Sequence, residues 1–203
     1  MLTPARIIEL NVKGFGVPAH ERLELANGLT LVIVPQRAVP LVAFQLLIRG
    51  GALGDPPGRA GVAALAAGLL DKGAGQRDAA AFAEAVEGAG GSFSASVGPE
   101  SLNISGQFLA QDQDRMLELL ADAVIAPRFA AEEFTRQQLR QIGHIRTLKD
   151  SDPSELLPLY GRALLFGEHP YGQPPGGSED SLQAVAHRDV IDYHRAHIGA
   201  VAE

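Results

Sequence analysis

The pattern of apolar and polar residues predicts that the chain begins its regular structure with strands. Residues 22–24 and 29–35 are β-prone runs separated by Asn27-Gly28, and an Asn-Gly pair in this position is a strong signal for a hairpin. Residues 41–49 are apolar almost without interruption. Such a run predicts a third strand that is buried on both faces.

A second pair of strands is predicted further along the chain. Residues 92–97 and 101–109 alternate apolar with polar side chains on either side of Gly98-Pro99. Alternation of this kind places one set of side chains on each face of a sheet. We therefore expect a second hairpin with one buried face and one solvated face.

The segments between and after these strands show helical spacing. Residues 61–72 form an alanine-rich stretch between glycine-rich turns, and Asp78 stands where it can cap a helix that ends at Gly88. Two longer helices are expected over 113–125 and 130–148. Their inward residues are predicted to be Met116, Leu117, Leu120 and Val124 in the first, and Phe134, Leu139, Ile142 and Ile145 in the second. Further helices are expected from Pro153 to about Gly167, after Ser178 or Ser181, and over 187–197.

This order of elements predicts an α+β fold of two layers, in which helices cover one face of a largely antiparallel sheet. With 203 residues the chain is long enough for one large domain, so we expect a single domain over 1–203. Its first part, about 1–20, is rich in proline and glycine and is expected to be an irregular arm.

Charge and composition exclude several classes of protein. The chain has 17 Lys+Arg against 24 Asp+Glu, a formal charge of -7, which gives no basic surface for nucleic acid. It has no cysteine, which excludes disulfides, thiolate catalysis and cysteine-ligated metal sites. Its longest apolar runs, such as 41–48, are too short for membrane insertion. The first ten residues lack the apolar core of a secretion signal, and if such a signal has been removed the periplasm is favoured over the cytoplasm.

One stretch, GRAGVAALAAGLLDKGA over residues 58–74, is distinguished by the side chains that it lacks. Ala67 and Gly68 follow Ala64 by three and four residues, so all three share one face of a helix. That face carries no polar side-chain atom. Small residues suit close packing of the helix on the sheet, and they leave the face without a group that could bind a metal or transfer a proton.

The order of several segments resembles the N-terminal domain of the pitrilysin/insulinase family of zinc peptidases, to which mitochondrial processing peptidase belongs. The resemblance spans roughly residues 22–198, and the segments that carry it are LANGLTLVIVP, GG, the 58–74 stretch, FAEAVEGAGGSFSAS, PRF, DSDPSE and LFGEHPYGQPPGGSEDSL. It implies the LuxS/processing-peptidase-like metallohydrolase fold. It also implies a chain that is cut short before a homologous C-terminal domain.

The resemblance implies a zinc site in active members that this chain does not reproduce. In those members an HxxEH motif supplies two histidine ligands and a glutamate base, and a later glutamate completes the ligand set. On this sequence the motif falls on Ala64, Ala67 and Gly68, and the later glutamate falls at or next to His144. No histidine lies between residues 20 and 144, so no shift of the alignment restores the motif. We therefore expect no catalytic residue, no bound metal and no cofactor.

A peptide-contacting pair is a further candidate implied by the resemblance. Active relatives have an Asn-Ala pair on the strand that binds the substrate, where this chain has Ser94-Ala95. The Ser94 hydroxyl can hydrogen-bond a peptide backbone, although a solvated strand residue is the simpler interpretation.

Three histidines near the end of the sequence form the other candidate group. His194 and His197 are three residues apart on a predicted helix and could share a metal ion, with His187 close by. An ordinary polar helix face is the favoured interpretation.

Two functional hypotheses from different classes follow. The first is a non-catalytic subunit that pairs with an active zinc peptidase, or with a second copy of itself, and assists peptide binding or closure of a chamber. This is what the resemblance implies, because the family includes heterodimers of active and inactive subunits. The alternative is a structural or assembly subunit without any role in proteolysis, similar to the core proteins of the respiratory cytochrome reductase. An enzyme with an unrelated site is the weakest possibility, since the sequence has no nucleophile-elbow motif.

Overall fold

The computed structural model describes residue 16, residues 18–151 and residues 153–199. The described residues fall into two units, one that ends at Val39 and one that begins at Pro40. Most of the predicted arm over 1–20 lies outside the described residues. The first unit contains a hairpin, and the second contains the larger sheet, the helices and the hydrophobic core.

The predicted first hairpin is confirmed. Strands β1 (Glu21–Glu24) and β2 (Thr30–Ile33) pair antiparallel. In the turn between them Gly28 has a φ of 82°, a backbone conformation that glycine adopts without strain. The Asn27 side-chain oxygen accepts a hydrogen bond from the Leu29 amide at 3.2 Å. The Asn-Gly pair therefore forms the turn for the reasons that made it a hairpin signal.

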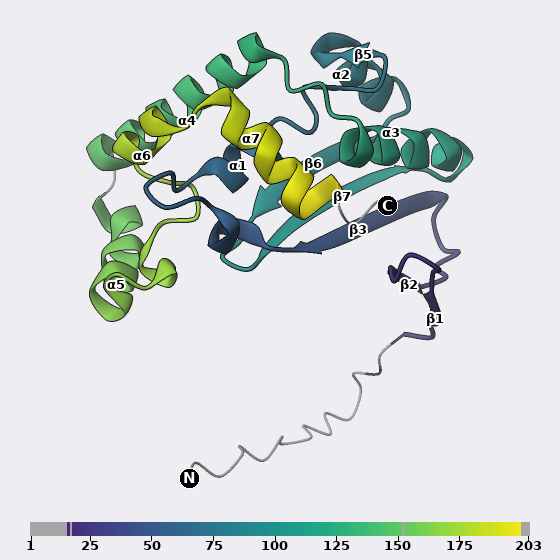
Figure 1. Cartoon of the computed structure of the whole chain (residues 1–203). Coiled ribbons are helices and arrows are strands. Elements are labelled where there is room, and N and C mark those ends of the chain that lie inside the picture. The colour runs from purple at the N-terminus through teal and green to yellow at the C-terminus, as the bar shows by residue number, and fades with distance from the viewer. Residues whose placement is uncertain (1–15, 17, 152, 200–203) are drawn as a thin grey trace. The chain divides into compact units, whose positions relative to one another are not determined.

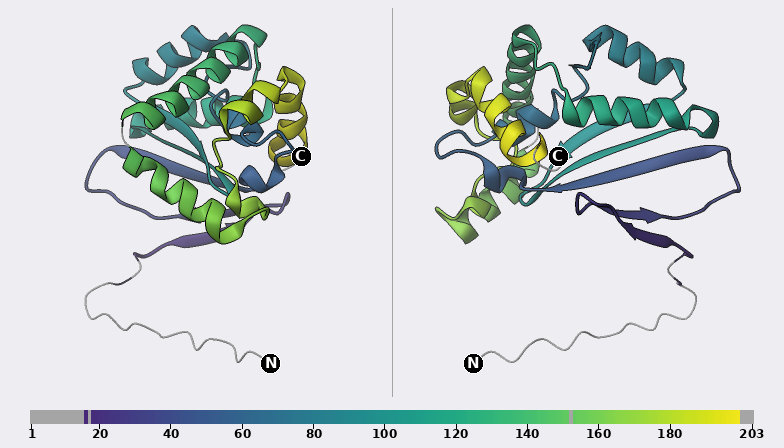
Figure 2. Two further views of the ribbon diagram at one scale, coloured as in Figure 1. Left: turned by 90° about the vertical axis from the view of Figure 1, so that its left-hand side faces the viewer. Right: turned by 45° about the vertical axis from the view of Figure 1, so that its right-hand side comes forward.

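A three-stranded antiparallel sheet underlies the second unit, and helices lie on one of its faces (Figure 1). The strand order is β3 (Leu41–Arg49), β7 (Ser101–Leu109), β6 (Ser92–Val97). β6 and β7 are the second predicted hairpin. Figure 2 shows the helical layer and the sheet from two further directions. The predicted α+β fold with two layers is confirmed.

The prediction that residues 41–49 are buried on both faces is wrong. Only alternate residues of β3 turn toward the core, and Ile48 is the most buried of them at 2% exposure. Leu47, its neighbour on the other face, is 64% exposed. The reason is the layer structure: helices cover a single face of the sheet, so an unbroken apolar run does not require two buried faces.

The helical layer follows the predicted order. The α-helices are α1 (Val62–Ala67), α2 (Ala79–Gly88), α3 (Gln113–Ile125), α4 (Ala131–Ser151), α5 (Leu157–Phe166), α6 (Glu179–Ala184) and α7 (His187–Tyr193). Shorter elements are η1 (Gly51–Gly54), η2 (Ala110–Asp112), η3 (Pro153–Leu156), η4 (Pro170–Gly172), a π-helical turn η5 (His194–Ile198), and the strand pair β4 (Gly73–Ala74) and β5 (Arg77–Asp78). No helix among the described residues combines the length and the apolarity needed to cross a membrane.

Capping and helix faces were predicted with mixed success. Asp78 caps α2 as expected, because its side chain accepts a hydrogen bond from the Ala81 amide at 2.9 Å. Leu117 and Leu139 were expected to face inward but are 55% and 64% exposed. Leu119, which was not selected, is fully buried. Leu117 and Leu119 are two residues apart, so they lie on different faces of the helix. The prediction therefore assigned the wrong one of these two leucines to the apolar stripe.

Candidate functional site

The helix that carries the predicted motif positions Ala64 and Ala67 is the most deeply buried helix segment of the unit. In α1, Ala63, Leu65 and Ala66 have no exposed surface, and Ala67 is 3% exposed. Regular helix spans six residues here and not the twelve expected over 61–72. After Ala67 the chain continues in tighter turns, with the Leu70 amide donating to the Ala67 carbonyl at 3.2 Å. Contacts with the sheet and with α4 and α7 surround this short helix.

Asp55, from the loop before α1, holds the amino-terminal end of that helix. Its two carboxylate oxygens accept hydrogen bonds from the Gly61 and Ala63 amides, both at 2.7 Å. Burial raises the pKa of Asp55 to about 6, although the two amide hydrogen bonds favour the charged form and oppose that shift. The side chain satisfies helix-terminal amides that have no partner within the helix.

Replacing Asp55 by asparagine tests this contact through the pH dependence of folding. The folded pKa of about 6 lies above the ordinary pKa of 3.8 for an aspartate, so between these values the folded chain binds more protons than the unfolded chain. Stability contributed by Asp55 therefore rises as the pH falls from 6 toward 4, and Asp55→Asn removes this rise. Urea unfolding should show a larger loss of stability in Asp55→Asn at pH 4.5 than at pH 7.5. A loss that is equal at both pH values would contradict a raised pKa.

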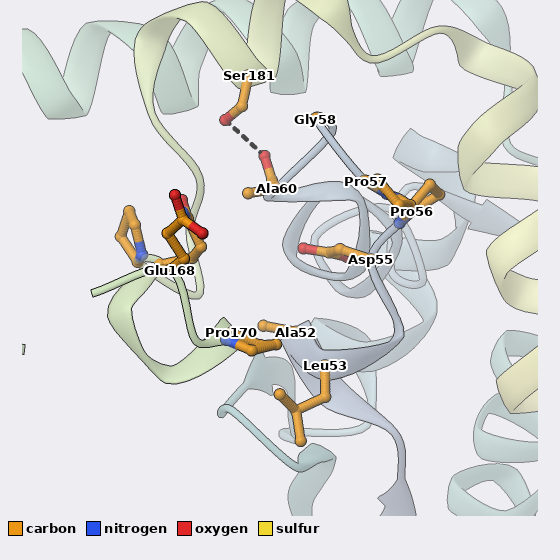
Figure 3. Close-up of a pocket in the computed structure, with 12 residues that line it drawn as sticks. Ala52, Leu53, Asp55, Pro56, Pro57, Gly58, Ala60, Glu168, Pro170 and Ser181 are labelled. Atoms are coloured by element: carbon orange, nitrogen blue, oxygen red, sulfur yellow. Dashed lines mark hydrogen bonds between the residues drawn. The ribbon is translucent and has the colours of Figure 1, made fainter. Parts of the chain in front are cut away.

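A cavity of about 370 Å³ opens beside this loop (Figure 3). Asp55 and Glu168 point into it from opposite sides, and Pro56, Pro57 and Pro170 contribute apolar walls. At its edge the Ser181 hydroxyl donates a hydrogen bond to the Ala60 carbonyl at 2.8 Å, which ties α6 to the loop before α1.

The last of the three predicted motif positions, Gly68, is covered by an amide side chain. A Cβ atom built on Gly68 would overlap the Nε2 atom of Gln137, from α4. The Oε1 atom of Gln137 is buried and has no hydrogen-bond partner among the described residues. Glycine at position 68 therefore allows Gln137 to occupy the space that a larger side chain would need.

His144 lies two helical turns beyond Gln137 on α4, where it lines a separate cavity of about 400 Å³. Gln137 and Gln141 line the same cavity. The structure thus brings Gln137 against Gly68, and places His144 at the cavity. The assignment of His144 to the missing ligand position stays a prediction.

The possible peptide-contacting pair lies on β6, an edge strand of the sheet. Ser94 and Ser105 of β7 share a hydrogen bond between their hydroxyl groups at 3.0 Å. Ala95 turns to the other face and packs against the core. Among the described residues β6 pairs only with β7, so its free edge could pair with an added strand. The peptide contact itself stays a prediction.

The histidines near the end of the described chain have structural hydrogen bonds. The Nε2 atoms of His187 and His194 lie 2.5 Å from the Phe129 carbonyl and 2.8 Å from the Val124 carbonyl. The predicted polar face is wrong for His194, which is only 7% exposed. His197 stacks beside Tyr193, with ring centroids 4.6 Å apart. No group of three or more possible metal ligands occurs within the described ranges.

Sequence reasoning missed two residues that shape the region around α1. Asp55 caps across six and eight positions, a spacing that no local capping motif contains. Gln137 was not among the predicted site residues. Its position seven residues before His144, and so on nearly the same face of α4, was the available signal.

Comparison with known proteins identifies the class of this fold. The crystal structure of a peptidase M16 inactive domain from Pseudomonas fluorescens superposes with a TM-score of 0.81 at 24% identity, over 87% of this chain and 43% of that one. The chain therefore has the fold of a peptidase M16 domain.

The sequence comparisons assign the family. The family description "Insulinase (Peptidase family M16)" matches residues 31–174, so the chain belongs to this family. An uncharacterized zinc protease of Rickettsia bellii is 26% identical over 87% of this chain and 43% of its own length. The non-peptidase homolog YmxG of Helicobacter pylori is 23% identical over 82% of this chain and 38% of its own length. The chain thus spans less than half the length of these relatives.

Proposed function

We propose that this chain is a non-catalytic member of the insulinase family. The observation that carries the proposal is the state of the α1 face, where Ala64, Ala67 and Gly68 replace the HxxEH motif expected from the family. Ala67 is 3% exposed, and Gln137 occupies the space next to Gly68. Side chains at these three positions supply no ligand for a metal ion and no base that could activate a water molecule.

The names of the relatives support both family membership and the lack of catalytic activity. Some are named zinc proteases, and others are named a non-peptidase homolog and an inactive domain. A family that contains both kinds can keep the fold while its catalytic motif is lost. The packing around α1 is consistent with such a loss, since Ala67 is part of the hydrophobic core together with Ala63 and Ala66.

The role that we propose is that of an accessory subunit. The chain would associate with an active zinc peptidase and help to bind peptide or to enclose it. Support comes from the free edge of β6 beside Ser94, which could accept an extended peptide through backbone hydrogen bonds.

Co-expression with an active homologue that carries HxxEH tests this role. We expect the two chains to purify together, and we expect a several-fold higher peptidase kcat/KM with this chain than without it. The isolated chain should bind no stoichiometric zinc and cleave no peptide.

Three results would count against the proposal. Stoichiometric zinc with chelator-sensitive peptidase activity in the isolated chain would show that it is an enzyme. Absence of both a complex and a rate increase would remove the accessory role. Recovery with membrane or envelope components, without the peptidase, would favour the structural and assembly role.

A further inference from the structure

The cavity lined by His144 lies between α4 and the proline-glycine loop at 174–177. Its volume is about 400 Å³, within the range of about 300–1,000 Å³ that is usual for ligand-binding pockets. Arg140 and His144 come from α4, Leu159 comes from α5, and Pro174 comes from the loop. Three separate segments therefore form one concave site.

Much of the lining is apolar. Ile145 and Leu148 of α4, Leu159 of α5, and Pro174 and Pro175 of the loop all contribute to it. The loop is held in place against α4, since the Gln141 amide nitrogen donates a hydrogen bond to the Gly176 carbonyl at 2.6 Å. The cavity therefore offers a fixed surface that suits an aliphatic side chain.

The charge of the cavity is the opposite of the charge of the chain. Among the side chains that the structure describes, its lining includes Arg140 and His144 but no aspartate or glutamate, whereas the whole chain has a formal charge of -7. Arg140 forms no ion pair among the described residues, whereas other cationic residues of α4 do. Arg136 is paired with Glu132 and Glu133, and Arg146 and Lys149 are both paired with Glu179.

We propose that this cavity binds the C-terminal residue of a peptide that ends in an aliphatic side chain. The side chain would fill the apolar part, and the terminal carboxylate would pair with the guanidinium of Arg140, with His144 beside it. A carboxylate is the complementary group because an arginine can bind it through two parallel hydrogen bonds. The inference rests on the peptide-binding part of the proposed function, but it does not require a second subunit.

Direct binding to the purified chain tests the site. The probes are an N-acetylated hexapeptide with C-terminal leucine as the free acid, the same peptide as its C-terminal amide, and a free acid that ends in serine. We expect calorimetric titration to show the first peptide binding about tenfold more tightly than either of the others, because each of the others lacks one of the two matched groups. The substitution Arg140→Gln should weaken the first peptide about tenfold and leave the affinity of the amide unchanged.

The matched control is Arg136→Gln, one turn earlier on α4 and outside the cavity lining. It should leave the affinities of all three peptides unchanged, and thermal unfolding should show that both variants are folded. Equal affinity for acid and amide would overturn the proposal, as would an Arg140→Gln variant that binds like the wild type. Absence of saturable binding at millimolar concentrations of the first peptide would overturn it as well.

Failure of this site and failure of the proposed function can be told apart. If Arg140→Gln loses peptide binding while no peptidase complex forms, the cavity stands and the accessory role does not. If a complex forms and stimulates cleavage although the three peptides bind alike, the accessory role stands and the specificity for a C-terminus does not.

Discussion

Replacing Ala67 by glutamate is expected to lower the free energy of unfolding by about 3 kcal/mol or more, and to give no peptidase activity. Ala67 is 3% exposed and belongs to the hydrophobic core around α1. A carboxylate introduced there loses its hydration without gaining a cationic partner, and a larger side chain must also displace its neighbours. Urea denaturation of the purified variant measures the change.

Ala64 on the same helix provides the matched control. It carries the same side chain as Ala67 but is partly exposed, so Ala64→Glu should lower the free energy of unfolding by about 1 kcal/mol or less. Equal losses in the two variants would show that the face around Ala67 is open, contrary to the structure. The triple variant Ala64→His, Ala67→Glu, Gly68→His should be less stable again, because the side chain at position 68 must displace Gln137.

Replacing His194 by alanine is expected to lower the free energy of unfolding by about 3 kcal/mol at pH 7.5. The variant loses the hydrogen bond to the Val124 carbonyl, at 2.8 Å, and the edge contact with the Phe129 ring, whose centroid lies 5.3 Å away. A buried carbonyl is then left without a partner and a cavity takes the place of the imidazole.

The same variant should change how stability depends on pH. Burial lowers the pKa of His194 below the ordinary histidine value of 6.5, and the charge of Arg195 acts in the same direction, while the hydrogen bond to Val124 opposes the shift. Between the folded pKa and 6.5 the unfolded chain binds more protons, so wild-type stability contributed by His194 falls as the pH falls through this interval.

The effect of His194→Ala should therefore shrink between pH 7.5 and pH 5, as measured by urea denaturation at each pH. His20 is exposed and lies in the other unit, so His20→Ala serves as the control and should have little effect at either pH. An effect of His194→Ala that grows on acidification would show that the histidine is charged in the folded chain.

The fold was more accessible from the sequence than the site, and particular residues show why. Local chemistry determines the turn at Gly28 and the cap at Asp78, so a short window of sequence was sufficient to predict them. The exposure of Leu47 could not be predicted in this way, because it depends on which face of the sheet the helices cover.

The site depends on contacts between distant segments. The predicted motif positions lie within one short stretch of sequence, but the contact of Gln137 with Gly68 joins two segments that are far apart in the chain. Likewise, the buried imidazole of His194 is hydrogen-bonded to the Val124 carbonyl, 70 positions earlier in the chain. The periodicity of apolar residues within one helix cannot predict a contact with so distant a residue.

The attachment of the loop before α1 to the loop before α6 has a consequence for which end of α1 is fixed. The two backbones touch directly, since a side chain on Gly177 would overlap the Ala60 carbonyl, which also accepts the hydrogen bond from Ser181. Together with Asp55 this anchors α1 at its amino-terminal end, away from positions 67 and 68. The predicted motif positions 67 and 68 lie at the other end of the helix, so substitutions there leave these contacts of the amino-terminal end in place.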